Sequence, residues 1–338
     1  MKIALDVMGG DNAPQATVEG AILASKETNA ELILVGDENQ ILDEMSKFKS
    51  RIDLTKLNLE IIHTTEVITM HDHPAKAVRN KKDSSLSVCA KLVAQGEAAG
   101  FVSMGNSGAV MAAALFYLKR LDGVLRPTII TRFPSLNGSV CIADMGANVD
   151  CKPENLLQFA IMTNIFCRKV LGMKDPRVGL VSIGEEPTKG NELSLAAYQL
   201  LAKADLNFIG NIEGYDIPSG KADIVVCDGF VGNVILKFGE GLSDMILKLI
   251  YRSFKKHPIS WASIPFLWPT LNDLRKKVDY SEFGGVPLLG VDGVCIIGHG
   301  KSNAKAVKNA IIAAINATKY DVAKAISEAL GKNGKADE

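Results

Sequence analysis

The stretch MKIALDVMGGDNAPQATVEGAILASKE, residues 1–27, contains an apolar run, a glycine turn and an amphipathic pattern in succession. Residues 3–8 have the length of a strand, and residues 17–27 carry apolar side chains at helical spacing. The first run is too short for a signal peptide and ends in Asp and Gly. We therefore expect a buried strand that leads through a tight turn into a helix.

The same succession recurs along most of the chain. Strands rich in Val, Ile and Leu that alternate with helices predict a three-layer α/β/α fold with a mainly parallel sheet. We expect one large domain over residues 1–330, with a projecting helical arm inserted at about 250–280 and a frayed tail at 331–338. Further strands are expected at 31–35, 59–63, 101–104, 128–132, 140–145, 178–183, 208–210, 224–227 and 294–297, and further helices at 40–48, 85–98, 110–121, 154–171, 193–204, 234–255 and 302–330.

Charge and cysteine usage narrow the class of protein. The 338 residues hold 38 basic and 38 acidic side chains, and this balance argues against a general nucleic-acid binder. Six cysteines without CxxC spacing indicate a reducing compartment and no zinc site. No stretch is long and apolar enough to suggest a membrane span.

Glycine and asparagine occur together near several expected strand ends. Glycine permits sharp turns, and asparagine adds an uncharged donor and acceptor. Ligands of parallel α/β sheets bind outside the carboxyl ends of the strands, so we expect a cleft of neutral donors that suits phosphate or an oxyanion. Turn chemistry alone is the alternative. The elements are Gly105-Asn106, Gly190-Asn191, Gly210-Asn211, Gly232-Asn233 and Gly146-Ala147-Asn148.

The run CIIGHGKS, residues 295–302, resembles a phosphate loop but has cysteine where the first glycine belongs and lies late in the chain. A nucleotide hydrolase is therefore excluded, and the absence of GxGxxG after the first strand weakens a dinucleotide site. We expect Ser302 to cap the last long helix and His299 to lie beside an anion pocket; plain capping is the alternative. Lys189, in a loop before a helix, is a candidate mobile cation for phosphate or simply a surface lysine.

Two segments suggest contacts with other molecules. A basic loop carries Arg79, Lys81 and Lys82, which would dock an acidic partner or remain solvated. The segment 257–277 combines Trp261, Phe266, Leu267 and Trp268 with basic residues, as at a membrane surface or a subunit contact; simple core is the third option. His71 and His73 flank Asp72 too weakly to indicate a metal, and we expect none.

Several motifs in this order resemble the bacterial phosphate acyltransferases, also called acyl-ACP:phosphate transacylases, over residues 1 to about 325. Two departures are Ser107, where we expect Thr, and Lys301, where we expect Ser. The motifs are DVMGGD at 6–11 with Ala13-Pro14, AVRNKK at 77–82, GNSGA at 105–109, DMGAN at 144–148, KGNE at 189–192, DGFVGN at 228–233, YSEFGG at 280–285 and GHGKS at 298–302.

The resemblance implies a fold like isocitrate/isopropylmalate dehydrogenases and phosphotransacetylase. It implies a lipid-biosynthetic transferase that moves a fatty acyl group from acyl carrier protein to inorganic phosphate, without a cofactor. The acyl phosphate would serve phospholipid synthesis. It further implies a cytoplasmic homodimer that associates peripherally with the membrane, where a glycerol 3-phosphate acyltransferase is a further candidate partner.

Direct attack of phosphate on the thioester fits these residues, because phosphate is largely dianionic at neutral pH and a thiol leaves easily, with a pKa of about 8.5. Positioning and oxyanion stabilisation would then suffice. Rival hypotheses are a metal-dependent hydroxy-acid dehydrogenase, a non-catalytic phosphate-binding module and a short-chain phosphotransacetylase that uses coenzyme A. The expected catalytic residues are Lys189, Asn233 and His299, and the expected phosphate or substrate contacts are Asp6, Gly9, Gly10, Asn106, Ser107, Asn148, Asn191 and Ser302.

Overall fold

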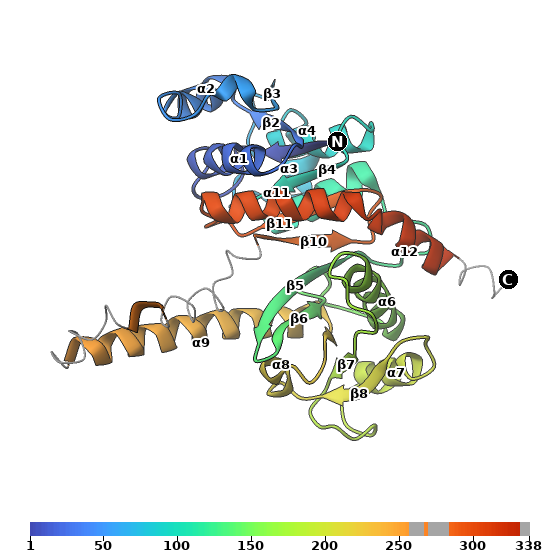
Figure 1. The fold of residues 1–338 in the computed structure, drawn as a ribbon. Helices are drawn as coiled ribbons and strands as arrows, with labels where there is room; N and C mark the ends of the chain where they lie inside the picture. Colours follow the sequence, from blue (N-terminus) through green and yellow to red (C-terminus); the bar gives the residue numbers. More distant parts are fainter. Residues whose placement is uncertain (257–266, 270–283, 332–338) are drawn as a thin grey trace.

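A computed structural model describes residues 1–256, 267–269 and 284–331 (Figure 1). Helices cover a single large sheet, as the alternating pattern predicts. The strands are β1 (Lys2–Asp6), β2 (Glu31–Gly36), β3 (Leu59–His63), β4 (Gly100–Ser103), β5 (Thr128–Ser135), β6 (Gly138–Ala143), β7 (Val178–Val181), β8 (Phe208–Ile212), β9 (Ile224–Val226), β10 (Gly285–Leu289) and β11 (Val294–Gly298). The helices are α1 (Gln15–Glu27), α2 (Glu38–Ser46), η1 (Leu54–Lys56), α3 (Pro74–Asn80), α4 (Ser85–Ala94), α5 (Ser107–Ala113), the π-helix η2 (Ala114–Leu118), α6 (Pro153–Lys169), α7 (Glu192–Leu201), α8 (Asp216–Ser219), α9 (Gly229–Lys256), α11 (Ala304–Lys319) and α12 (Val322–Gly331).

The strand order is β3-β2-β1-β4-β11-β10-β5-β6-β9-β7-β8. Strands on each flank pair in parallel, whereas β10 is antiparallel to both β11 and β5, and β5 is antiparallel to β6. The mainly parallel α/β sheet is therefore confirmed. Because three successive pairs are antiparallel, β1, β4 and β11 run opposite to β6, β9 and β7. The carboxyl ends of the two parallel blocks consequently lie at opposite edges of the sheet.

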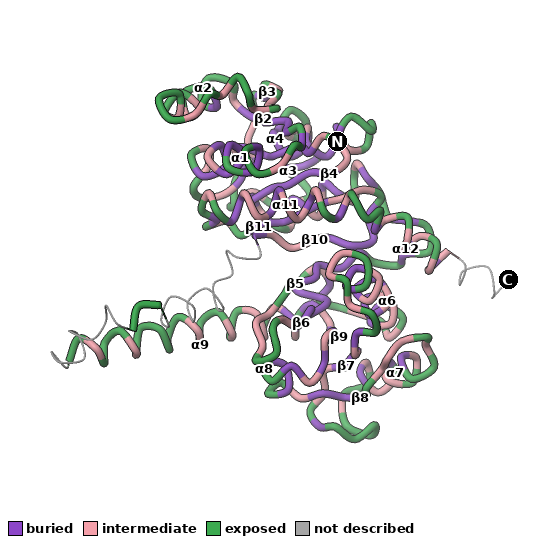
Figure 2. The backbone as a smooth tube through the Cα atoms, in the orientation of Figure 1, coloured by how far each residue is buried: buried purple, intermediate pink, exposed green. Residues whose placement is uncertain are grey.

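Close helix packing seals one face of the first block. A Cβ atom on Gly20 would lie 2.5 Å from the Cβ of Val307, so only glycine lets α1 approach α11 this closely. On the lower half of the molecule, α6 and α7 pack together beside β7 (Figure 1). The strands β4 and β9 are buried throughout, and β1, β2 and β11 at all but one residue, as Figure 2 shows, whereas the edge strand β3 has no buried residue.

The helix α9 projects away from the sheet (Figures 1 and 2), and its only buried residues are Gly229 and Gly232. The expected arm at about 250–280 lies mostly outside the described residues; its first part continues α9 to Lys256. Of the expected tail, only Gly331 is described, at the end of α12. No described helix is both long and apolar enough to cross a bilayer.

Three local expectations are wrong. The basic stretch begins with the helix α3 rather than a loop, because Pro74 at its first turn suits a helix start. The long last helix is two helices, α11 and α12, interrupted at Asp321, whose φ is 48°. The strand β10 was not expected, since Pro287 and the flanking glycines mask its pattern.

Candidate active site

Three turns meet where β1, β4 and β11 end. A Cβ atom on Gly9 would lie 2.9 Å from the amide nitrogen of Gly105, and one on Gly10 would lie 3.1 Å from the carbonyl oxygen of Gly300. The φ of Gly10 is +102°, which favours glycine, and the Asp11 amide donates to the Gly300 carbonyl at 2.7 Å. The three turns are therefore packed backbone to backbone at this edge, which larger side chains at Gly9 and Gly10 would prevent.

Asp6 braces these turns from beneath. Its carboxylate is 2% exposed and accepts hydrogen bonds of 2.6 Å from the hydroxyls of Ser85 and Ser103. The amides of Met8 and Gly9 also donate to it, and burial raises its pKa despite these bonds. The expected substrate contact by Asp6 is therefore wrong, because its oxygens are already used within the protein. The sequence analysis did not identify Ser85 and Ser103 as partners of Asp6. Ser103 could have been suspected from its position two residues before Gly105.

Ser302 lies at the same edge, just before α11. It does not cap the helix as expected: Asn303 does, accepting from the Ala306 amide at 2.9 Å. Ser302 is only 3% exposed, and its buried hydroxyl makes no hydrogen bond to any described residue. An unpaired buried hydroxyl is costly, so it points to a missing partner. The turn itself is tied, since the Lys301 amide donates to Nδ1 of His299.

Asn106 and Ser107 start α5 beside these turns. Asn106 caps the helix by accepting from the Ala109 amide, and its Nδ2 donates to the Met70 carbonyl at 3.1 Å. The Asn106 side chain is therefore occupied in holding the loop before α3. Ser107 is exposed, and its hydroxyl makes no hydrogen bond to any described residue, so it remains a candidate ligand contact.

A second set of turns lies where β6 and β9 end. The buried carboxylate of Asp144 accepts from the Asn148 amide at 2.6 Å, from the Thr128 hydroxyl at 3.0 Å and from the Ile129 amide at 2.9 Å. Burial raises its pKa. Asn148 also donates from Nδ2 to the Pro127 carbonyl at 2.7 Å. Asn148 is therefore buried scaffold, and the expected substrate contact is wrong.

Asn233 and Lys189 remain available at this second edge. Asn233 is half-buried on α9, and its Cβ lies 3.5 Å from the Cβ position of Gly146. Lys189 is exposed, and its ammonium group forms no ion pair or hydrogen bond with the described parts of the chain. Its main chain is fixed, because the Ser182 hydroxyl donates to the Lys189 carbonyl at 2.9 Å. Asn191 is used as the cap of α7.

The strand order separates the two sets of turns along the sheet. Six sheet steps separate β4 from β7, which is roughly 29 Å at about 4.8 Å per strand. Their carboxyl ends also face opposite ways. The strand pairing therefore does not bring Gly9, Ser107 and Ser302 next to Lys189 along the sheet, and the expected single cleft that joins them stays a prediction.

The expected docking residues differ in accessibility. Arg79 and Lys82 are exposed, but the Lys81 ammonium donates to the Asp72 carboxylate at 2.7 Å and to the Val67 carbonyl at 2.9 Å. The Lys81 contact, aided by the Thr69 amide, lowers the pKa of Asp72 to about 2. Lys81 thus fixes the loop that Asn106 holds.

Of the aromatic segment, Leu267 and Trp268 are described and exposed, at 41% and 58%, whereas Trp261 and Phe266 lie outside the described residues. Nowhere in residues 1–256, 267–269 and 284–331 do three or more His, Cys, Asp or Glu gather in a metal-binding group. All six cysteines are free, and five are buried.

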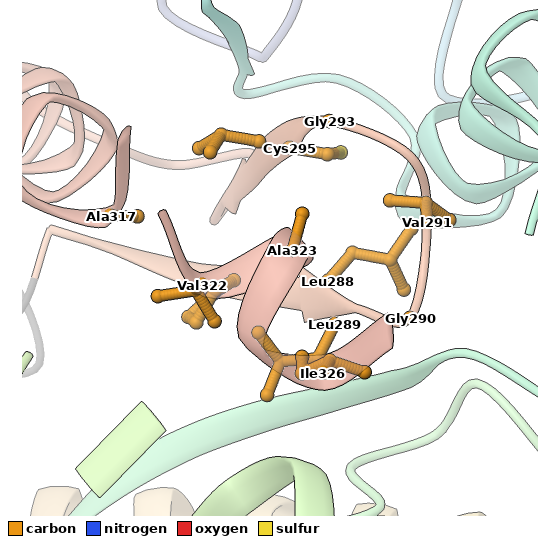
Figure 3. A pocket seen from close by; sticks show the side chains of 12 residues that line it. Leu288, Leu289, Gly290, Val291, Gly293, Cys295, Ala317, Val322, Ala323 and Ile326 are labelled. Carbon is orange, nitrogen blue, oxygen red and sulfur yellow. The ribbon is translucent and has the colours of Figure 1, made fainter. Parts of the chain in front are cut away.

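A small cavity behind α12 is not a candidate site. Figure 3 shows Leu288, Val291, Val322 and Ile326 around it, and its volume is about 20 Å³. A space of one water in an apolar lining stays dry and offers no polar partner.

Comparisons with known proteins agree with this fold. The "Fatty acid synthesis protein" family matches residues 1–325. The chain is 67% identical over 330 residues to the phosphate acyltransferase of Endomicrobium trichonymphae, covering 98% of each, and 50% identical over 311 residues to that of Pelotomaculum thermopropionicum, covering 92% and 90%.

Solved structures show the same fold at low identity. A phosphotransacetylase from Streptococcus pyogenes matches with a TM-score of 0.65 and 16% identity, covering 94% of each chain. A 4-hydroxythreonine-4-phosphate dehydrogenase from Burkholderia phymatum matches with a TM-score of 0.50 and 13% identity, covering 96% and 97%. On the sequence relatives, the chain belongs to the fatty acid synthesis protein family and is an acyltransferase of its phosphate acyltransferase group.

Proposed function

We propose that this protein transfers a fatty acyl group from the thioester of acyl carrier protein to inorganic phosphate. The observation that carries the proposal is the buried, unpartnered hydroxyl of Ser302 at the start of α11, beside the turns of Gly9, Gly10 and Gly300. The N-terminus of α11, a helix of 16 residues, favours a bound dianion. Phosphate would supply the acceptor oxygen that this hydroxyl lacks.

The proposed reaction is a direct displacement. A phosphate oxygen forms a bond to the acyl carbonyl carbon, the carbon–sulfur bond breaks, and the electron pair leaves with sulfur as a thiolate. Since a thiol has a pKa of about 8.5, the thiolate leaves without a strong acid. The hydroxyl of Ser107 would stabilise the oxyanion, and one such donor can contribute about 10²–10³ in rate. His299, in the same turn as Gly300 and Lys301, would assist the leaving thiolate.

The test is a turnover assay with palmitoyl-acyl carrier protein. We expect the thioester to disappear only when phosphate is present, with one acyl phosphate formed for each thiol released. A second assay replaces the donor by acetyl-coenzyme A. Turnover of this donor in place of palmitoyl-acyl carrier protein would indicate a short-chain phosphotransacetylase. Thioester loss without phosphate, or trapping of an acylated side chain, contradicts the proposal.

We further propose a homodimer, because α9 has an apolar stripe with no partner in the described chain. Its members recur at three- and four-residue spacing along one face and are 39–69% exposed. Burying such a stripe against a second copy removes a large apolar surface from water, and a two-fold dimer is the commonest closed arrangement. The stripe consists of Val234, Phe238, Leu242, Met245 and Leu249.

A dimer offers a way to use Lys189 and Asn233, because the second edge of one chain can approach the first edge of another. Complementation tests this. Mixing inactive Lys189→Ala with inactive Ser302→Asp would give about half mixed dimers with one intact site each, and so about a quarter of wild-type activity. Mixed chains that stay inactive after refolding together would show that Lys189 and Ser302 act within the same chain, and a Lys189→Ala variant that is active by itself would leave Lys189 outside the site.

Carrier protein docking is proposed for Arg79 and Lys82, which are exposed on and just after α3. The double charge reversal Arg79→Glu with Lys82→Glu is expected to raise KM for acyl carrier protein and to weaken its salt dependence. The matched control is Lys203→Glu, an exposed site at the end of α7. Equal KM values for both variants would contradict the docking surface.

Peripheral membrane association is proposed from exposed Leu267 and Trp268, since an aromatic ring and an apolar chain suit the lipid interface. It would place a cytoplasmic enzyme where its acyl phosphate is consumed by a membrane glycerol 3-phosphate acyltransferase. We expect Trp268→Ala to reduce co-sedimentation with anionic phospholipid vesicles. Unchanged sedimentation would refute this contact.

A further inference from the structure

A groove of about 250 Å³ lies between α3 and the helix pair formed by α5 and the π-helix. Five of its six lining residues are apolar, and the sixth is Arg79, whose aliphatic stem suits an apolar wall. We propose that this groove binds the acyl chain of the substrate, an inference that rests on the proposed function. The lining residues are Ala75, Val78, Arg79, Ala112, Leu115 and Phe116.

Both walls of the groove begin at the candidate phosphate site. Pro74, the first residue of α3, has a ring carbon 2.9 Å from the Cβ position of Gly108 in α5, and Asn106 donates to the Met70 carbonyl just before α3. Along α5, Ala112 is five residues beyond Ser107, which is roughly 7.5 Å at the helical rise. An acyl chain whose carbonyl lies at Ser107 therefore enters the groove within its first several carbons.

The far wall of the groove includes a π-helix. The segment Ala114–Leu118 is wound as a π-helix, and its last turn closes with a bond from the Lys119 amide to the Ala114 carbonyl. Such segments interrupt regular helix packing and frequently occur at functional sites. Here Phe116 is left 53% exposed beside the cavity, with its ring edge against Tyr117 at 4.9 Å between centroids. A bound chain would cover this exposed ring.

The dimensions favour a single hydrocarbon chain over a partner helix. An α-helix is about 10–12 Å across with its side chains and would insert only single side chains, whereas a hydrocarbon chain can lie along the apolar walls of the groove. Each buried methylene contributes about 0.8 kcal/mol, or about a fourfold change in binding. A groove that holds several methylenes therefore discriminates strongly between long and short chains.

The test is the variant Ala112→Phe, which fills the groove, with Ala202→Phe as the matched control on the exposed end of α7. For Ala112→Phe we expect kcat/KM with palmitoyl-acyl carrier protein to fall at least about tenfold, and with butyryl-acyl carrier protein to change less than about twofold. Ala202→Phe should change neither. If Ala112→Phe changes kcat/KM equally for the palmitoyl and butyryl donors, or changes neither, the groove does not bind the acyl chain. The proposed reaction is unaffected by that result.

Two further measurements distinguish failure of the groove from misfolding of the variant and from failure of the proposed reaction. If Ala112→Phe does not fold, Phe116→Ala replaces it; this exposed side chain can be truncated, and the same loss selective for the palmitoyl chain is expected. If the wild type converts neither thioester, the proposed function fails, and binding of the fluorescent fatty acid cis-parinaric acid tests the groove by itself. Binding that Ala112→Phe abolishes supports an acyl-chain groove, and binding that it leaves unchanged refutes it.

Discussion

The substitution Ser302→Ala tests the phosphate site through opposite effects on stability and on binding. The Ser302 hydroxyl is buried without a partner, and such a group costs about 1–3 kcal/mol of desolvation. Removing it should therefore leave the free energy of unfolding unchanged or raise it by about 1 kcal/mol in the absence of phosphate. With phosphate bound, the variant loses a hydrogen bond to a charged acceptor, which contributes about 1.5–3 kcal/mol.

We expect the KM for phosphate to rise about tenfold to a hundredfold. The kcat/KM for the acyl donor is measured separately, at saturating phosphate. Thermal unfolding with and without phosphate provides a second readout, because a ligand that binds only the folded state raises the unfolding temperature. That increase should shrink in Ser302→Ala. The matched control is Ser87→Ala: this buried serine donates to the Lys81 carbonyl at 3.1 Å, so its loss should cost about 1 kcal/mol without changing KM. A destabilised Ser302→Ala with unchanged KM would refute the reasoning.

Two further perturbations test the scaffold. The pKa of Asp72 is lowered from 3.8 to about 2, so its bond to Lys81 stabilises the protein above pH 3.8 and is lost as the pH falls toward 2. Lys81→Met should therefore lower the unfolding temperature at neutral pH and converge with the wild type near pH 2; a constant difference across this range would argue against the pair. In α9, a Cβ on Gly232 would lie 1.9 Å from the carbonyl oxygen of Asp144, whereas Gly241 has open space. Chemical denaturation should show Gly232→Ala destabilised by about 1–3 kcal/mol and Gly241→Ala stabilised by up to about 1 kcal/mol; equal values would contradict the packing.

Local patterns predicted most strands and helices, because burial on both faces and helical periodicity are properties of short segments. The strand at Leu59–His63 was predicted to the residue, and the first strand and helix within two residues. The prediction missed β10, where Pro287 and glycines replace the usual apolar run. It also took the start of α3 for a loop, since basic composition outweighed the proline signal.

The candidate site was predicted only in part. The glycine turns at Gly9, Gly10 and the start of α11 do meet at one edge, as strands that run in parallel require. Sequence gave no measure of side-chain burial, so Asp6 and Asn148 were taken for ligand contacts although both brace the turns. It also could not distinguish Ser302 from Asn303 as the helix cap, because adjacent residues of both types suit that position.

The sequence by itself determined the α/β class, the glycine turns at strand ends and the family, since each depends on residues close together in the chain or on their order along it. Tertiary structure alone decided which turns share an edge. Strand direction depends on pairings between residues far apart in sequence, and three antiparallel pairs around β10 and β5 place Lys189 and Asn233 opposite the turns of Gly9 and Ser302.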